Sequence, residues 1–271
     1  MEMPLVSIIT PTFNREAFLP AIAACVRSQS YQNIEWLVLD DSEQPSLALT
    51  KDPWEKLRYF HTTERLSVGA KRNQLLAHAS GEVVIHFDDD DYYGPHYISK
   101  AMDQLSRHEA DVALLCGFFV AHLNTNGFGY YRTRIKKGLA FAFNKSGVRP
   151  VNLDRVNIPL IHLCFGWAYI YKRIVWEQTK FEELNVFEDR EFIREATGNF
   201  KTVAYESRQM DCLHAIHARS SSQCFPQFLI PAFVVHALSG DAYQHVKWLK
   251  SIATTSNPAI SAAPVLSESV V

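Results

Sequence analysis

The chain has 271 residues, of which 47% are hydrophobic and 21% are charged, so it is long enough and apolar enough to form a packed globular core. Its formal net charge is −2, with acids and bases interspersed, which argues against nucleic acid as a partner. The five cysteines are scattered and form no CxxC pair, so we expect reduced thiols and no zinc or redox site. The start of the chain lacks the pattern of a secretory signal, and we expect a cytoplasmic protein.

Strand-like and helix-like segments alternate over residues 1–110. Strands are expected at 5–10, 35–40, 57–62 and 82–88, and helices at 16–29, 67–80 and 95–108. Such alternation predicts an α/β fold with a mainly parallel central sheet flanked by helices. The helices are assigned from apolar spacing, and Ser67 is a suitable N-cap for the second of them.

The pattern becomes less regular after about Asp111. Strands are expected at 111–122, 127–135, 168–173 and 200–206, with a helix that begins near Glu188. We interpret residues 111–225 as a mixed half built on the same sheet, followed by a C-terminal extension at 226–271.

Three further segments lead to separate predictions. Residues 138–159 are rich in Asn, Gly and Pro, which predicts a long loop that could cover a site. Residues 251–271 are mostly small and carry one charge, which predicts disorder.

The run 225–238, "FPQFLIPAFVVHAL", is too short and too interrupted to span a bilayer. A buried helix or strand is favoured for this run, and peripheral contact with a membrane surface is the alternative.

Four consecutive aspartates, Asp88–Asp91, follow the apolar segment "EVVIHF". Neighbouring carboxylates repel one another unless a cation lies between them. Mg²⁺ and Mn²⁺ suit oxygen ligands and take their remaining ligands from waters and a diphosphate. Parallel strands end at one edge of a sheet, where ligands bind, and alternation along a strand would point Asp88 and Asp90 the same way. The alternative is a solvated loop or a helix cap, for which Asp91 is suitable.

Other nucleotide and metal motifs do not match. An EF-hand counted from Asp89 would place Tyr93 and Lys100 at positions that need oxygen ligands. The chain has no GxxxxGK[ST] sequence, and "GFGYYR" lacks the third glycine of a dinucleotide-binding turn. Kinase-like and dehydrogenase-like functions therefore lose support.

Four motifs in order resemble a known family. "VSIITPTFNR", "WLVLDDS", "SVGAKRNQLLAHASGEVVIHFDDDDYYGP" and "FEDREFIREA" are similar to the inverting nucleotide-sugar glycosyltransferases of family 2, over about residues 6–222. The resemblance implies a GT-A fold, in which a Rossmann-like nucleotide-binding half and an acceptor-binding half form one domain. It also implies transfer of a sugar from a nucleoside-diphosphate sugar, expected to be UDP-linked, to a glycan, lipid-linked or other hydroxyl acceptor.

The resemblance further implies a set of donor-binding residues. Three residues would lie beside the base and ribose, namely Thr10, Pro11 and Phe13. Asp41 would accept a hydrogen bond from a uracil-type base, and Arg72 would lie near the diphosphate or sugar. Ser42 follows Asp41 where the family often has glycine, which leaves the path of that loop open.

The same resemblance assigns the aspartate run to a DxD-like element. Asp90 is the expected principal ligand of Mn²⁺ or Mg²⁺, with Asp88 beside it and Asp89 near the ribose, although the run leaves the register open by one residue. His217 is expected to complete the metal site, and His214 is the alternative. Gly166 and Trp167 occur where the family contacts acceptor sugars, but Trp167 could equally be a core residue.

The candidate general base is Asp189. In a helix that begins near Glu188, Asp189 would share a stripe with apolar residues, whereas Glu188 would join Glu191 and Glu195 on a solvated face. The resemblance places the family's base at the Asp of this Glu-Asp pair. The alternative is that Asp189 only complements the positive end of the helix.

Two rival functions remain at this level. A sugar nucleotidyltransferase needs a Gly-rich loop after the first strand, and "TPTFNR" has none. A catalytically inactive nucleotide- or glycan-binding module would have no need of Asp189.

Overall fold

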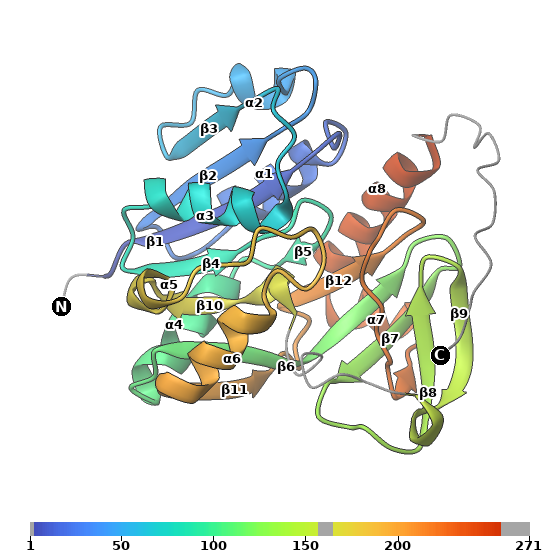
Figure 1. Ribbon diagram of the computed structural model, residues 1–271. Coiled ribbons are helices and arrows are strands. Elements are labelled where there is room, and N and C mark those ends of the chain that lie inside the picture. Colours follow the sequence, from blue (N-terminus) through green and yellow to red (C-terminus); the bar gives the residue numbers. More distant parts are fainter. Residues whose placement is uncertain (1–2, 157–164, 256–271) are drawn as a thin grey trace, which may run out of the picture.

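The fold is built on one large mixed sheet in a computed structural model that describes residues 3–156 and 165–255 (Figure 1). The order of its main strands is β13-β7-β6-β10-β4-β1-β2-β3. Four of them pair in parallel, namely β1 (Val6–Thr12), β2 (Ile34–Asp40), β3 (Leu57–His61) and β4 (Val83–His86). This parallel part confirms the predicted α/β class.

Helices cover the parallel strands. They are α1 (Leu19–Arg27), the short α2 (Leu47–Thr50), α3 (Val68–His78) and α4 (Tyr97–Arg107). Ser67 caps α3 as predicted, because its side chain accepts a hydrogen bond from the backbone N–H of Ala70. Cys25 and three other cysteines (Cys116, Cys212 and Cys224) are free and buried, and Cys164 lies outside the described residues.

The mixed half centres on β6 (Val112–His122), which is buried along its whole length. It pairs in parallel with β11 (Thr202–Glu206) and β12 (Cys212–Ile216), and antiparallel with β7 (Gly127–Arg132) and β10 (Ile170–Lys172). The remaining elements here are β5 (Tyr92–Tyr93), β13 (Phe228–Leu229), α5 (Arg173–Gln178), α6 (Arg190–Asn199) and a 3₁₀ turn at Gly166–Ala168. Because β10 pairs with both β4 and β6, the two halves share one continuous sheet.

The predicted long loop at 138–159 is wrong for its described part. It forms a hairpin of β8 (Leu139–Asn144) and β9 (Gly147–Asn152), followed by a 3₁₀ turn at Leu153–Arg155. Its buried residues are Ala140, Ala142, Phe143 and Leu153. Apolar packing therefore outweighs the Gly- and Pro-rich composition, and residues 157–159 lie outside the described part of the chain.

The C-terminal extension packs on the same core through α7 (Ala232–Leu238) and α8 (Gly240–Thr255). Helix α8 buries residues three or four positions apart: Ala242, Val246, Leu249 and Ile252. The prediction of disorder from residue 251 is therefore wrong for 251–255, and residues 256–271 lie outside the described residues.

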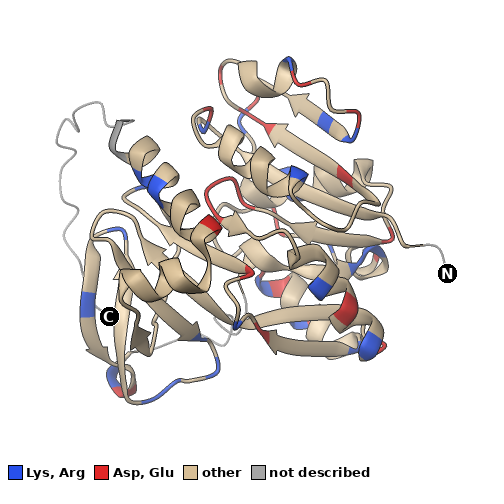
Figure 2. Cartoon of the chain, turned by 180° about the vertical axis from the view of Figure 1, so that it is seen from behind, with Lys and Arg blue, Asp and Glu red and all other residues tan. Residues whose placement is uncertain are grey.

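The run 225–238 only partly follows the expectation of burial. Phe225 and Val235 are buried, but four of its large apolar side chains are exposed: Phe228, Leu229, Phe233 and Leu238. No helix among the described residues combines the length and apolarity needed to cross a membrane. Charged residues of both signs are distributed over the molecule (Figure 2).

Candidate active site

A cavity of about 630 Å³ opens at the carboxyl ends of the parallel strands β1 and β4. Its lining comes from residues 11–15, 65–72, 88–90, 165–167, 185–189, 214 and 219–223. No residue of the 138–156 hairpin lines it, so the described part of that segment does not cover the site. The volume is in the range of small-molecule sites, and the position is the one expected for an open parallel sheet.

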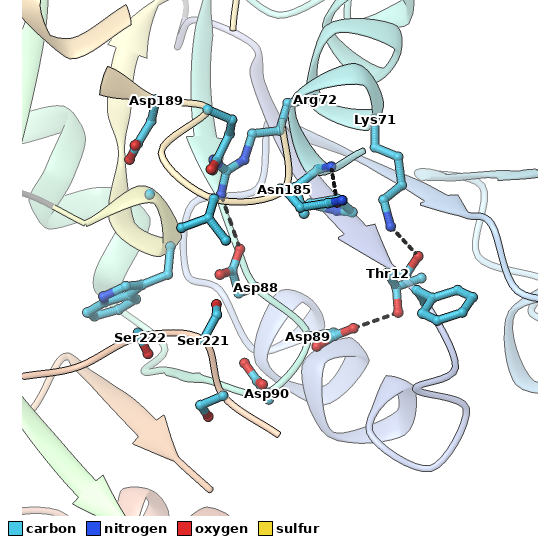
Figure 3. Close-up of a pocket in the computed structure, with 18 of the residues that line it drawn as sticks. Thr12, Lys71, Arg72, Asp88, Asp89, Asp90, Asn185, Asp189, Ser221 and Ser222 are labelled. Carbon is cyan, nitrogen blue, oxygen red and sulfur yellow. Dashed lines mark hydrogen bonds and ion pairs between the residues drawn. The ribbon is translucent and has the colours of Figure 1, made fainter. Parts of the chain in front are cut away.

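Each of the four aspartates has a different protein partner. Asp88 Oδ1 lies 3.9 Å from Arg72 Nη2, and Asp89 Oδ2 accepts a 2.6 Å hydrogen bond from Thr12 Oγ1 (Figure 3). Asp90 and Asp91 meet two histidines, described below. Asp88 and Asp90 both line the cavity, but strand alternation does not place them there, because β4 ends at His86 and the acids follow it.

The carboxylates of the run also differ in proton affinity. Burial and the neighbouring carboxylates raise the pKa of Asp88 to about 7. Burial likewise raises the pKa of Asp89, to about 6. Burial opposes ionisation of Asp90 too, but Arg15 and His217 hold its pKa well below the usual range. Of these three carboxylates, Asp90 therefore has the lowest affinity for a proton.

Asp90 and His217 form the pair of donors best suited to a cation. Asp90 Oδ2 lies 2.9 Å from His217 Nε2, close to the roughly 3 Å between neighbouring ligands of an octahedral ion with bonds of about 2.1 Å. Among the residues that the structure describes, no group of three or more His, Cys, Asp or Glu could hold a metal by itself. Two protein ligands nevertheless fit Mg²⁺ or Mn²⁺, which complete their shells with phosphates and waters. Asp88 is not brought to this pair.

Arg15 lies against the same pair. Its Nη2 atom is 3.4 Å from Asp90 Oδ2, and its Nη1 atom is 3.3 Å from His217 Nε2. Its guanidinium also stacks over Phe18, 5.1 Å from the ring centroid. Arg15 therefore supplies positive charge to the run from the β1–α1 connection.

Asp91 has a structural role, but not as a helix cap. Helix α4 begins only at Tyr97, and Asp91 instead accepts a 2.8 Å hydrogen bond from the backbone N–H of Ala215. Its carboxylate lies 2.9 Å from Nδ1 of His214, whose Nε2 is 2.7 Å from Ser222 Oγ. This chain of contacts fixes the wall of the cavity around Ser222 and leaves His217 as the histidine beside Asp90.

Only part of the predicted base-binding turn reaches the cavity. Pro11 and Phe13 line it, and the Arg65 guanidinium stacks on Phe13 at 3.4 Å from the ring centroid. Thr10 is fully buried inside the protein and does not line the cavity. Its Oγ1 accepts a hydrogen bond from Trp36 Nε1.

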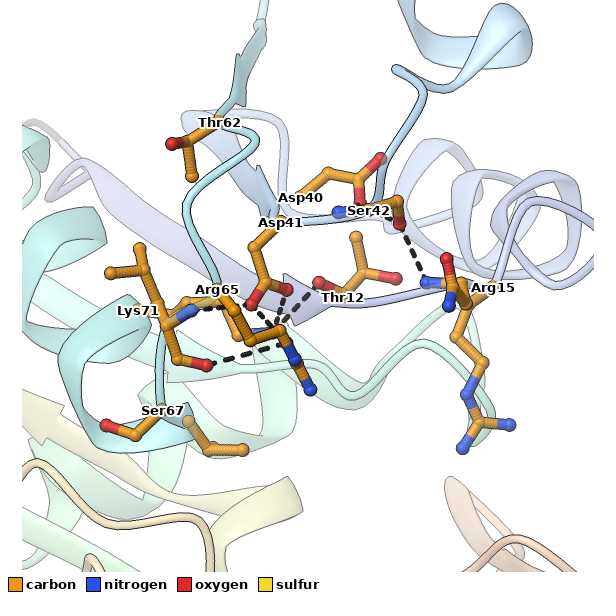
Figure 4. Close-up of polar contacts among 12 residues, drawn as sticks. Thr12, Arg15, Asp40, Asp41, Ser42, Thr62, Arg65, Ser67 and Lys71 are labelled. Carbon is orange, nitrogen blue, oxygen red and sulfur yellow. Dashed lines mark hydrogen bonds and ion pairs between the residues drawn. The ribbon is translucent and has the colours of Figure 1, made fainter.

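Asp41 is also withdrawn from the cavity. Its side chain has no exposed surface and accepts hydrogen bonds from Lys71 Nζ at 2.8 Å, from the Leu66 N–H at 2.9 Å, and from Arg65 (Figure 4). Ser42, which follows Asp41, ties this loop to the β1–α1 connection, because its Oγ accepts a 2.7 Å hydrogen bond from the Asn14 N–H.

Arg72 and Glu188 form a buried ion pair at the back of the cavity. The pKa of Arg72 is raised by the carboxylates around it, although burial opposes this. The expectation that Glu188 faces solvent is wrong, because α6 begins at Arg190 and Glu188 precedes it. Gly166 leaves room for this pair, since a Cβ atom there would lie 2.9 Å from Arg72 Nη2.

Asp189 occupies the N-cap position of α6, but its side chain makes no capping hydrogen bond. Its Oδ2 instead accepts a 2.6 Å hydrogen bond from the Tyr169 hydroxyl. Asp189 lines the cavity on the side away from Asp89 and Asp90 (Figure 3). Trp167 also contributes to the lining, but it is only 3% exposed and is mainly a core residue.

Several lining residues were not singled out from the sequence. Lys71 directly precedes Arg72, and Arg15 ends the motif "TPTFNR". Their positions beside or within selected motifs could have indicated that they lie near the site. Arg219 follows His217 by two positions and also lines the cavity. The lining residue Ser222 carried no local signal, because its partner His214 lies 8 residues away. The same is true of Tyr169, which lies behind the lining and holds Asp189, 20 residues away.

The model of the family "Glycosyl transferase family 2" matches residues 7–178. An uncharacterized glycosyltransferase of Haemophilus influenzae is 34% identical over 108 residues, which are 38% of this chain and 43% of that protein. The GalNAc(5)-diNAcBac-PP-undecaprenol beta-1,3-glucosyltransferase of Campylobacter jejuni is 30% identical over 116 residues, 41% of this chain and 37% of that protein. The chain thus spans less than half the length of these curated relatives.

A crystal structure of S. aureus TarS 1-349 in complex with UDP-GlcNAc superposes with a TM-score of 0.59 at 21% identity. The match covers 86% of this chain and 64% of that one, and at this identity it shows a shared fold. The order of strands, the site at their carboxyl ends and the match over residues 7–178 agree: the chain belongs to glycosyl transferase family 2.

Proposed function

We propose that the chain is a metal-dependent inverting glycosyltransferase that moves a sugar from a UDP-linked donor to a hydroxyl acceptor. The observation that carries the proposal is one cavity lined from both sides by acids. Asp88–Asp90 enter it from the turn after β4, and Asp189 enters from the start of α6. A sugar between them would have its leaving group on one side and a base on the other.

The donor side is assigned to the half formed by residues 1–110. Phe13 and the stacked Arg65 offer a flat face for a base, while Arg15 and Arg72 bring positive charge toward a diphosphate. Crystal structures of S. aureus TarS 1-349, which shares this fold, are complexes with UDP and with UDP-GlcNAc, and this supports a uridine nucleotide as the donor here.

Asp90 and His217 would hold Mn²⁺ or Mg²⁺, which supplies positive charge to the diphosphate as it leaves. Asp88 would contribute indirectly, through Arg72, and Asp89 would lie near the ribose. Asp90 suits this role because Arg15 and His217 lower its pKa, although burial opposes this, and because its Oδ2 lies 2.9 Å from His217 Nε2.

Asp189 is the proposed general base. It takes the proton of the acceptor hydroxyl as that oxygen attacks the anomeric carbon. Tyr169 donates to Oδ2 and so orients the carboxylate, leaving Oδ1 for the acceptor. The helix-terminus alternative has less support, because the side chain makes no capping hydrogen bond.

The acceptor side is assigned to residues 111–225, which include Gly166 and Trp167 at the cavity. The C. jejuni relative is named for a lipid-linked oligosaccharide acceptor, which supports a glycan or lipid-linked acceptor for this chain.

The decisive test compares Asp189→Asn with the unchanged chain on a panel of nucleotide sugars in manganese buffer. The variant should lose at least a hundredfold in nucleoside-diphosphate release with acceptor present, while calorimetry gives an unchanged affinity for UDP. Glu191→Gln is the matched control, because the side chain of Glu191 is 45% exposed, forms an ion pair with Arg194 and does not line the cavity.

Retained turnover in Asp189→Asn would remove Asp189 from the mechanism. Release of pyrophosphate by the unchanged chain would indicate a nucleotidyltransferase. Binding of UDP without release of any product across the panel would indicate a module that has lost catalysis.

A further inference from the structure

Four large apolar side chains are exposed on the lobe formed by residues 118–156 and 212–255, and we call them the apolar patch. They are Leu139, Phe228, Leu229 and Phe233, with exposed fractions of 68%, 56%, 48% and 74%. An antiparallel β-bridge joins Phe143 and Cys224, and the Phe141 N–H donates a hydrogen bond to the Pro226 carbonyl. Continued by two residues, this register brings Leu139 opposite Phe228. Phe233 follows on α7, after a short turn.

The apolar patch has no role in the proposed reaction. None of its residues lines the cavity, and they come from three elements: Leu139 from β8, Phe228 and Leu229 from β13, and Phe233 from α7. A group of large apolar side chains left in water costs solvation free energy, so such a group usually marks a surface that binds something.

The lobe that carries the apolar patch is strongly basic. Residues 118–156 contain seven Lys or Arg and one acid, Asp154. Residues 212–255 contain three Lys or Arg and one acid, Asp241. Because the whole chain has a net charge of −2, the rest of the molecule is correspondingly acidic. Figure 2 shows more blue than red on this lobe.

Two of the basic residues lie close in sequence to Leu139 of the apolar patch. Arg134 and Lys137 are exposed in the connection that leads directly into Leu139. An anionic phospholipid surface matches this combination, because large apolar side chains enter the headgroup region while Lys and Arg contact lipid phosphates. A second copy of this chain would place one basic surface against another, which disfavours a homodimer through the same face.

We propose that the apolar patch and its basic surroundings dock the chain on an anionic lipid bilayer. Binding needs both components: the charge draws the lobe to the surface, and the apolar side chains hold it there. The docking surface does not depend on the proposed transfer reaction, and its test uses no sugar donor.

The test is co-sedimentation of the full chain with vesicles of phosphatidylcholine alone, and with vesicles of equal parts phosphatidylcholine and phosphatidylglycerol. The unchanged chain should bind the anionic vesicles and release from them in high salt. Phe228→Ser/Phe233→Ser should lower binding about tenfold or more. Arg134→Gln/Lys137→Gln should lower binding on the order of fivefold per residue.

Leu47→Ser/Lys51→Gln is the matched control, since Leu47 is 67% exposed on α2 in the other half and the exposed Lys51 follows that helix directly. It should bind as the unchanged chain does, and thermal unfolding should verify that every variant is folded. The proposal is overturned if the unchanged chain ignores anionic vesicles, or if the control loses as much binding as the patch variants. Light scattering that shows a dimer abolished by Phe228→Ser/Phe233→Ser, without vesicle binding, would assign the apolar patch to a second copy.

Discussion

Replacement of Asp41 by Asn separates two roles that this residue could have. The resemblance to the family implies a contact with the base, whereas the structure buries the carboxylate beneath three donors. An asparagine has one carbonyl oxygen, so its amide group would face Lys71 Nζ or the Leu66 N–H with no lone pair to offer. Lys71 would keep only the Thr12 carbonyl, at 2.9 Å, as a partner.

Removal of one member of a buried ion pair costs about 3–5 kcal/mol. At about 2–4 °C per kcal/mol for a chain of this size, the melting temperature should fall on the order of 10 °C. The double variant Asp41→Asn/Lys71→Met should recover part of this loss, because no charge is then left unpaired.

Urea unfolding at several pH values provides the assay. Burial by itself would raise the pKa of Asp41, but the hydrogen bonds from Lys71 and Leu66 hold this pKa below its ordinary value of 3.8. A carboxylate whose pKa is lower in the folded state contributes its full stabilisation at pH values above its unfolded-state pKa. This stabilisation is lost as the pH falls through the folded-state pKa. The difference between the two proteins should therefore be constant from pH 7 to pH 5. A loss below about 1 kcal/mol, with UDP affinity reduced tenfold, would refute the structural role and favour the base contact.

Three shorter predictions concern other parts of the molecule. Asp90→Ala should weaken UDP binding at least tenfold in manganese buffer and leave binding in EDTA unchanged; equal loss in both buffers would contradict a metal role. Gly166→Ala should cost about 1–3 kcal/mol by thermal unfolding, because the methyl group would meet Arg72 at 2.9 Å, and an unchanged melting temperature would show that Arg72 can move. Leu249→Ala should cost about 2–5 kcal/mol, because Leu249 is fully buried on α8; a loss below 1 kcal/mol would mean that α8 packs loosely.

The elements with strong periodic patterns were predicted well. Apolar spacing located α1, α3 and α4, and the N-cap at Ser67 was correct, because these signals depend on residues a few positions apart. The 138–152 hairpin was missed because its composition is that of a loop and its strands are held by packing. Glu188 was misjudged because α6 begins at Arg190, two residues later than predicted, so helical periodicity does not apply to Glu188.

The sequence by itself determined the α/β architecture, the family and the collection of acids at the ends of the strands. It could not assign a partner to each acid. Thr12 lies 77 residues from Asp89, His214 lies 123 from Asp91, and His217 lies 127 from Asp90. Only the tertiary structure decided that Asp41 is enclosed, that Asp88 faces Arg72, and that Asp90 meets His217. The physical reason is that local patterns reflect contacts within one or two turns of chain, whereas the charge state and ligands of a carboxylate depend on groups that folding brings from far away.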